Sequence, residues 1–450
     1  MAKNLNMTQG RPGKLLFSFA LPLMFGNVFQ QLYTVVDTAI VGQGVGMDAL
    51  AALGTVDWLN WLFLGIAQGF TQGFCVRISQ KFGEGDLMGM KRIAGQSAIL
   101  CILIAFIGTV VGQVLLPVFL WALRVPTSLQ PMATLYTRIL LAGFPFVMFF
   151  NYCSSVLRAV GDSKTPLKAM ITASVTNIIL DSVTVFLLDW GIAGAAAATV
   201  FSQLLAGLLC AVRIRNNPAL QFGKNECKPE ILLCKDLVGI GAPVAAKNVI
   251  IALGGMAVQT VVNSFDMSFI AGFTATNKLY GLLEIAASSY GYAVTTYVGQ
   301  NYGAMNLERI RQGIKAAVKL SLITAAGIAL VMLLFGRPIT MLFISTEDPT
   351  LAAAAGDTAY WCLCTMAVSL PALYILYVYL SGLQGLGNTV ATMLSGILEF
   401  FLRVILSALV GYTGFRYGIF GAEVAAWWGA AIFLILSYYR TYRKILKKHA

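Results

Sequence analysis

Charge is scarce in this sequence: Asp, Glu, Lys and Arg make up 11% of the 450 residues, against 58% for the apolar types. A water-soluble chain of this length cannot hide so large an apolar excess in its core. No polar stretch long enough for a soluble domain interrupts the apolar runs. The composition therefore excludes a soluble protein and predicts that much of the surface faces lipid.

Histidine is nearly absent as well, since the penultimate residue, His449, is the only one. This excludes a histidine-based metal cluster and a Ser-His-Asp triad. The eight cysteines are scattered, and Cys362 and Cys364 are too close together and too isolated to suggest a metal site. We expect core packing for the cysteines, no cofactor and no enzymatic activity, because the apolar runs also lack a nucleophile elbow.

What the sequence has in abundance is apolar runs of about 20 residues, the length that crosses the hydrocarbon core of a bilayer. Charges and Gly or Pro breaks separate twelve such runs. The predicted fold is an all-α polytopic membrane protein with twelve transmembrane helices. We place the spans near residues 15–41, 54–76, 93–120, 134–157, 166–188, 192–212, 237–263, 271–298, 313–335, 356–381, 389–411 and 419–439.

The formal charge of +12 is compatible with a nucleic-acid partner or with membrane topology, so the positions of the basic residues decide. Of the 31 Lys and Arg, 24 lie in alternate connecting segments, the two chain ends included. The opposite segments hold only Arg124, Arg138, Arg337 and Arg416. By the positive-inside rule both termini are cytoplasmic, which requires an even number of crossings. We expect a multi-pass monomer of the plasma (inner) membrane, with the lipid bilayer and not nucleic acid as its partner.

The two halves of the sequence match each other at a nearly constant offset of about 220 to 227 residues, which indicates an internal repeat. Gly161-Asp162-Ser163 is echoed by Gly387-Asn388-Thr389, and Gly191-Ile-Ala-Gly-Ala195 by Gly418-Ile-Phe-Gly-Ala422. The matched prolines are Pro22 with Pro243, Pro117 with Pro338 and Pro145 with Pro371.

Each copy of the repeat contains an even number of spans, so the two copies are parallel repeats about an axis along the membrane normal. We predict an N-terminal six-helix bundle (N-lobe) at 1–212, a cytoplasmic linker at 213–236 and a C-terminal six-helix bundle (C-lobe) at 237–450. This is a transporter architecture. Duplicated bundles also occur in channels and membrane enzymes, but no selectivity-filter motif is apparent.

Ionisable residues within the predicted spans are few, and each needs a partner or a task, because burying a charge in the bilayer costs about 3 kcal/mol on insertion scales. Glu399 and Arg403 stand four apart with the acid first, the spacing of an ion pair on one helix. Lys247 and Glu284 carry opposite charges on successive spans, so we expect them to neutralise each other. Glu423 lies one turn into the last span, near the outer interface.

Asp37 and Asp181 have no basic residue three or four positions away on their own helices, and Asn177 lies one turn before Asp181. Asp37, Asp181 and Thr199 are expected at one depth, roughly 6–10 Å below the outer boundary at about 1.5 Å per residue. Two carboxylates, an amide oxygen and a hydroxyl suit a hard cation such as Na⁺. Because two neighbouring carboxylates resist being charged together, the same site can take a proton. The pattern does not separate the two ions.

The second half of the repeat lacks these side chains, since the equivalent positions are about Val258, Ser407 or Ala408, and Ala426. Our hypothesis is that the first bundle carries the coupling cation, bound by Asp37, Asn177, Asp181 and Thr199. The alternative is that hydrogen bonds alone satisfy the two buried carboxylates.

Over essentially its full length the chain resembles the multidrug and toxic compound extrusion (MATE) family. The resemblance rests on Pro22, Gln30-Gln-Leu-Tyr-Thr-Val-Val-Asp37-Thr-Ala-Ile-Val-Gly42, Gly161-Asp162, Asn177-Ile-Ile-Leu-Asp181 and Gly194-Ala-Ala-Ala-Ala-Thr199. Within the family it is similar to the prokaryotic branch with an N-lobe cation site, where residues matching Asp37, Asn177, Asp181 and Thr199 are implicated in Na⁺ or H⁺ binding. The C-lobe acids of the other bacterial branch are not evident, and helix seven offers Lys247 instead.

The resemblance implies a secondary active transporter that exports small cationic or amphipathic organic compounds by Na⁺ or H⁺ antiport through alternating access. We predict a substrate cleft lined by Gln30, Tyr33, Tyr136, Phe150 and Asn151, because aromatic rings attract organic cations. The alternative is a lipid-linked precursor flippase or polysaccharide exporter of the same superfamily. Such a protein should show a cationic cleft for pyrophosphate, whereas the first half of this chain offers acids.

Overall fold

The computed structural model describes residues 5–223, 226–341 and 349–449 of the chain. In these ranges the regular secondary structure is helical throughout. Apolar segments in a bilayer form helices because every backbone N–H and C=O must find its partner within the segment. The long apolar helices confirm the predicted all-α fold.

Helices from the first half of the chain are α1 (Pro12–Gly44), α2 (Met47–Glu84), α3 (Leu87–Ala122), α4 (Gln130–Ala142), α5 (Phe144–Ala159), α6 (Lys164–Ser182), the π-helix η1 (Val183–Leu187) and α7 (Gly191–Arg215). Those of the second half are α8 (Ile231–Val262), α9 (Met267–Gly303), α10 (Leu307–Met341), α11 (Pro349–Gly385), α12 (Thr389–Thr413), the 3₁₀-helix η2 (Arg416–Gly418) and α13 (Ile419–His449).

Ten of the described helices are long and apolar enough to cross a membrane. The pair α4 and α5, which is bent by 43° at Gly143, adds an eleventh crossing if the two count as one span. The chain is therefore a multi-pass membrane protein, as its composition predicts.

The chain forms two compact units, which we call unit 1 (Met1–Asn6 and Leu21–Ala245) and unit 2 (Met7–Ala20 and Ala246–Ala450). Helix α1 passes from unit 2 to unit 1 beside Pro22, and α8 passes from unit 1 to unit 2 beside Pro243. A proline inside a helix removes one backbone hydrogen bond and is a point where the helix can bend. These two prolines are a matched pair of the sequence repeat.

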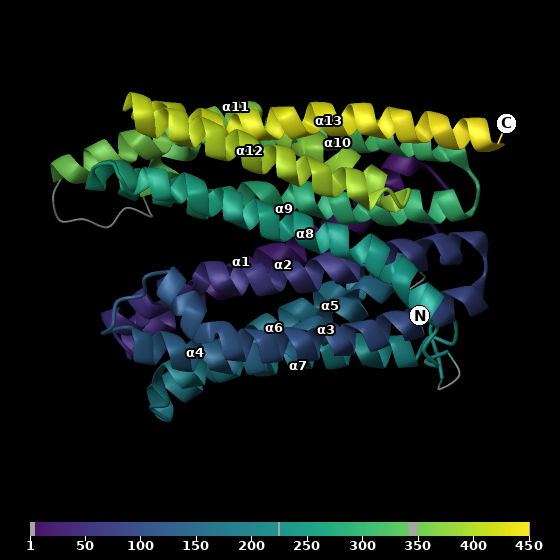
Figure 1. Cartoon of the computed structure of the whole chain (residues 1–450), viewed down its shortest axis with the longest axis horizontal. Helices are drawn as coiled ribbons and strands as arrows, with labels where there is room; N and C mark the ends of the chain where they lie inside the picture. The colour runs from purple at the N-terminus through teal and green to yellow at the C-terminus, as the bar shows by residue number, and fades with distance from the viewer. Residues whose placement is uncertain (1–4, 224–225, 342–348, 450) are drawn as a thin grey trace. The chain divides into compact units, whose positions relative to one another are not determined.

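In unit 1, α5 is the central helix, packed against α2, α3 and α7 (Figure 1). Most of its side chains are buried. Helix α7 reaches the junction of α4 and α5 only because residue 143 is glycine: a Cβ there would lie 2.3 Å from Cγ2 of Val200. The missing side chain at the bend thus lets α7 pack against both α4 and α5.

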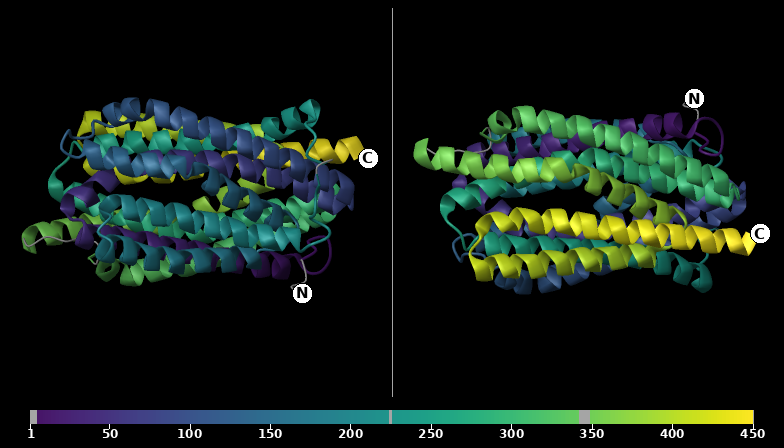
Figure 2. Two further views of the ribbon diagram at one scale, coloured as in Figure 1. Left: turned by 90° about the horizontal axis from the view of Figure 1, so that it is seen from below. Right: turned by 90° about the horizontal axis from the view of Figure 1, so that it is seen from above.

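In unit 2, α11 has the central position, packed against α9, α10 and α13, and α12 runs beside α13 (Figure 2). The turns before α6 and α12 have the same backbone conformation, with φ of 88° at Gly161 and 84° at Gly387. Only glycine adopts such values without strain. Asn388 then caps α12 by accepting a hydrogen bond from the Ala391 backbone N–H at 3.2 Å.

Candidate functional site

Three elements of unit 1 converge near Asp181: the end of α1, the π-helix η1 and the first half of α7. A Cβ at Gly44 would lie 2.3 Å from Val185, and one at Gly194 would lie 2.7 Å from Thr184, so α1 and α7 both pack tightly on η1. The π-helix begins two residues after Asp181. Such a wide turn changes the direction of the side chains next to it and is frequent at functional sites.

The carboxyl groups of Asp37 and Asp181 lie within hydrogen-bonding reach of each other. Both residues are buried, with 7% and 0% of their surface exposed. Oδ1 of Asp37 and both carboxylate oxygens of Asp181 lack a donor in the described part of the chain. Within the same ranges no Lys or Arg forms an ion pair with either acid. Two adjacent acids are thus buried without the partners that such groups normally require.

Asn177 and Thr199 add further unpaired polar atoms. Asn177 is 1% exposed, and neither atom of its side-chain amide has a hydrogen-bond partner among the described residues. The hydroxyl of Thr199 is also buried without a partner. All four residues predicted for the cation site therefore carry buried polar atoms that the described protein leaves unsatisfied.

Two further hydroxyl groups, which are not among the predicted ligands, share this property. Ser174 lies three residues before Asn177 on α6, and Ser202 lies three residues after Thr199 on α7. Both hydroxyls are buried and unpaired in the described ranges. Their spacing places them on the same helix faces as the predicted ligands, which is the signal that identifies them.

The residues predicted for the substrate cleft separate into two groups. Tyr33 lies one turn before Asp37 and interacts with Gln30 and Gln203, and the buried Tyr136 is within electrostatic range of both acids. The two tyrosines therefore lie close enough to the carboxylates to interact with them, and a cleft role for this group stays a prediction.

Phe150 and Asn151 form the second group and are buried in α5. The Asn151 amide donates to the Val147 carbonyl at 2.9 Å within its own helix. A cleft role for the pair remains a prediction. In α2, Asp57 is a further carboxylate that the sequence pattern did not single out; the residue is exposed, and it is within electrostatic range of Tyr136.

Unit 2 carries a different polar cluster. Arg403 pairs with Glu399 at 3.3 Å on the same helix, and its guanidinium also donates to both carboxylate oxygens of Glu423, at 2.9 and 3.0 Å. The predicted position of Glu423 near the outer interface stays a prediction, and the structure adds Arg403 as its ion-pair partner.

Lys247 and Glu284, which were expected to neutralise each other, are within electrostatic range of one another but do not form a direct ion pair. The two side chains line one cavity, and within the described ranges no ion pair of 4.0 Å or less joins them. Glu284 instead accepts a hydrogen bond from the Tyr377 hydroxyl. An aromatic hydroxyl thus holds the acid that was expected to bind the lysine.

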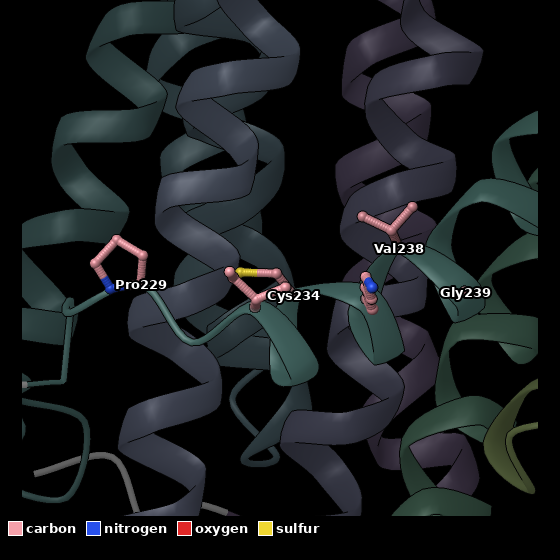
Figure 3. Close-up of a pocket in the computed structure, with 6 residues that line it drawn as sticks. Pro229, Cys234, Val238 and Gly239 are labelled. Atoms are coloured by element: carbon pink, nitrogen blue, oxygen red, sulfur yellow. The ribbon is translucent and has the colours of Figure 1, made fainter.

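A second cavity, of about 440 Å³, is a groove at the start of α8 in unit 1 (Figure 3). It is lined by Pro229, Ile231, Cys234, Lys235, Val238 and Gly239. Carboxylates are missing from this lining, so the groove is distinct from the Asp37 and Asp181 site. Its mostly apolar side chains suit contact with lipid.

In the residues that the structure describes, no group of three or more His, Cys, Asp and Glu side chains gathers as a metal centre. The unit 1 site offers two carboxylates together with neutral amide and hydroxyl oxygens. Such an oxygen set fits a hard monovalent cation or a proton better than a tightly held transition metal.

Long apolar helices around a buried acidic site define a polytopic membrane protein of the kind that moves solutes. The sequence model of the MatE family matches residues 22–183 and 243–409, and the chain belongs to this family. Members of this family are transporters and not enzymes. The match therefore confirms the predicted family and the prediction that the protein is not an enzyme.

Among curated relatives, "Probable multidrug resistance protein YpnP" of Bacillus subtilis (strain 168) is 29% identical over 426 residues, which cover 93% of each chain. "Probable multidrug resistance protein NorM" of Thermotoga maritima is 25% identical over 91% of this chain and 88% of its own. A solved structure described as "Crystal structure of MATE in complex with MaL6" has a TM-score of 0.91, with 23% identity over 99% of this chain and 100% of that one. The fold is thus that of solved MATE structures.

Proposed function

We propose that this protein is a secondary active transporter that exports small cationic or amphipathic organic compounds in exchange for Na⁺ or H⁺, by alternating access. One observation carries the proposal. The four polar residues predicted for the coupling site, Asp37, Asn177, Asp181 and Thr199, have buried polar atoms without hydrogen-bond partners in the described chain. Burying such atoms unpaired is costly, so a cation or a proton is the ligand that makes the arrangement stable.

In the proposed cycle, the coupling ion and the substrate bind alternately. When the ion is bound, its charge offsets the two carboxylates of Asp37 and Asp181. When the ion is released to the cytoplasm, the two acids favour binding of a positively charged substrate. Gln30, Tyr33 and Tyr136 would contact this substrate, since the aromatic rings of the two tyrosines attract organic cations. Exchange of one positive ligand for the other drives the change in access.

The driving force is sufficient for this exchange. One elementary charge crossing 100 mV releases about 2.3 kcal/mol. A hundredfold solute gradient costs about 2.8 kcal/mol at roughly 1.4 kcal/mol per factor of ten. One or two cations per cycle therefore support export.

We further propose twelve spans in two parallel six-helix repeats, with both termini in the cytoplasm of a bacterial cell and the chain in the inner membrane as a monomer. The ten apolar helices and the bent pair α4 and α5 supply eleven crossings. Helix α9, which is 37 residues long, is the natural twelfth, because its polar residues Lys278 and Glu284 lower its hydropathy without shortening it. The family model matches the two halves separately, which favours the repeat.

The names of the relatives favour drug efflux over the alternative function. Both curated relatives are described as probable multidrug resistance proteins. A flippase for lipid-linked precursors or a polysaccharide exporter needs basic groups for pyrophosphate. The unit 1 site offers acids that no Lys or Arg neutralises in the described ranges.

The proposal is tested by dye export in everted membrane vesicles, with Na⁺ and H⁺ gradients imposed separately on the wild-type chain. One of the two gradients should drive concentrative uptake of a cationic dye. Asp37→Asn and Asp181→Asn should each reduce the driven uptake to the level of vesicles without the protein. Uptake that neither gradient drives, or wild-type rates in both variants, would contradict the proposal.

A further inference from the structure

Unit 2 contains a buried lysine that has no direct hydrogen-bond or ion-pair partner among the described residues. Lys247 of α8 is 8% exposed, and in the described chain its ammonium group forms no hydrogen bond and no ion pair within 4.0 Å. A buried ammonium is costly unless opposite charge surrounds it. The position therefore calls for an explanation beyond packing.

The lysine faces a small cavity of about 40 Å³ within unit 2. A cavity needs about 10–15 Å³ of such space to hold a water molecule, so this one has room for water or a small cation. Its lining is drawn from α8, α9, α11, α12 and α13 and consists of Lys247, Ile251, Tyr280, Glu284, Leu373, Leu376, Tyr377, Glu399, Arg403 and Trp427.

Two glycines make room for the charged side chains. A Cβ at Gly396 of α12 would lie 2.7 Å from Cγ of Lys247, so only glycine lets the lysine stem lie along α12. A Cβ at Gly254 of α8 would lie 3.3 Å from Cδ of Arg403. Helices α8 and α12 thus each have a glycine at the point where the basic side chain of the other helix passes. The glycine of α12 leaves the space that the Lys247 side chain occupies.

The charges around the cavity need a further positive group. Arg403 is held by Glu423 and by one oxygen of Glu399. The other oxygen of Glu399, Oε1, has no hydrogen-bond partner in the described ranges, and Glu284 is held by the Tyr377 hydroxyl. Lys247 and Arg403 are both in electrostatic range of these two acids, but the guanidinium of Arg403 is already bonded to Glu423 and Glu399. Without Lys247, the carboxylates of Glu284 and Glu399 would face a small cavity in which the remaining cation, Arg403, is already bonded to Glu423 and to one oxygen of Glu399.

We propose that the Lys247 ammonium is a tethered cation: it takes the place that a free cation would have in unit 2 and thereby confines binding of the coupling ion to unit 1. The inference rests on the proposed function, which assigns the coupling ion to Asp37 and Asp181. An anion-binding role for Lys247 is disfavoured, because the three acids of the cluster already outnumber Lys247 and Arg403.

The test is a gain of cation binding. Equilibrium binding of ²²Na⁺ is measured on the purified full-length chain in detergent, in the Asp37→Asn/Asp181→Asn background, which lacks the proposed unit 1 site. Adding Lys247→Met should raise ²²Na⁺ binding at least tenfold above that background. Lys247→Arg, which keeps the charge, should leave binding at background, and adding Glu284→Gln to the Lys247→Met variant should remove the gain.

Stability provides a second measurement on the same variants. The Lys247→Met chain should unfold at a higher temperature in NaCl than in choline chloride, whose cation is too large for the cavity, whereas the Lys247→Arg chain should show no such difference. A folded Lys247→Met chain that gains no ²²Na⁺ binding would overturn the inference, and so would a destabilised one that Na⁺ does not rescue.

The proposed function has a separate readout. It is judged by the difference between the wild-type chain and the Asp37→Asn/Asp181→Asn background in gradient-driven dye transport. The gain of ²²Na⁺ binding in Lys247→Met is measured within that background. The proposed function and the tethered-cation role of Lys247 can therefore fail independently of each other.

Discussion

In unit 1, Asp37 and Asp181 lie side by side with carboxylate oxygens that no donor satisfies in the described chain, whereas in unit 2 Arg403 joins Glu399 to Glu423. Both clusters are buried in long helices of a membrane protein. Paired charges hold neighbouring helices in one arrangement, because separating them would expose each charge to apolar surroundings. Unpaired acids give no such stability, which supports the proposed binding role of unit 1, whereas the ion pairs of unit 2 fit a structural role.

The largest effect should follow removal of the central arginine of unit 2. Arg403→Met removes the ion-pair partner of both Glu399 and Glu423, which costs about 3–5 kcal/mol of folding free energy for a broken buried pair. Thermal or SDS unfolding of the purified chain measures the loss. The triple variant Glu399→Gln/Arg403→Met/Glu423→Gln should recover most of it. A loss below about 1 kcal/mol in the single variant would show that this network does not stabilise unit 2.

The next largest effect is on transport and not on folding. Asp181→Asn should abolish the roughly hundredfold concentration that a cation gradient supports, equivalent to about 2.8 kcal/mol. The same variant should unfold no more easily than the wild type, because a neutral amide beside Asp37 removes a like-charge contact. Dye transport and thermal unfolding are measured on one preparation. Destabilisation as large as that of Arg403→Met would make Asp181 a structural residue.

A smaller effect is expected where α8 and α12 meet. Gly396→Ala places a methyl group 2.7 Å from the stem of Lys247 and should cost about 1–3 kcal/mol, as overpacking does. Gly327→Ala in α10 is the matched control, because its added Cβ meets no atom within 4 Å. The control should be neutral or stabilising by up to about 1 kcal/mol, since alanine favours helix. Equal unfolding temperatures for the two variants would contradict the close packing of Lys247 against Gly396.

The smallest effect concerns a neutral ligand. Thr199→Ala removes one hydroxyl from the unit 1 site and should raise the half-saturating cation concentration for transport two- to tenfold, about 0.5–1.5 kcal/mol per hydrogen-bonding group. Ser407→Ala removes a buried hydroxyl that has no partner in the described ranges, at a unit 2 position that the repeat matches to Asp181, and should leave that concentration unchanged. A shift in Ser407→Ala as large as in Thr199→Ala would remove the distinction between the units.

Much of the fold follows from the sequence, because apolar length and the hydrogen-bonding demand of the bilayer leave helices as the solution. The spacing from Asn177 to Asp181 also predicted a shared face correctly, since helix geometry alone sets it. The break at Gly143 was not predicted: it depends on the close approach of Val200 from another helix.

Partners across helices were the least predictable feature. From the charges alone, Glu284 was expected to be neutralised by Lys247, but the direct hydrogen bond to Glu284 comes from the Tyr377 hydroxyl of α11. Likewise Arg403, four residues from Glu399, bonds more extensively to Glu423 of α13 than to its helical neighbour. Charge signs give the possible pairs, and only the packing of helices distant in sequence decides which pairs form.

The most direct test compares the acids of the two units in one transport assay. Proteoliposomes are prepared with the wild type, Asp37→Asn/Asp181→Asn and Lys247→Met/Glu284→Gln, and each is given a Na⁺ or an H⁺ gradient to drive a cationic dye. The account predicts that the first double variant loses driven transport under both gradients while the second, which removes one charge of each sign from unit 2, retains it. Driven transport that survives in Asp37→Asn/Asp181→Asn and is lost in Lys247→Met/Glu284→Gln would contradict it.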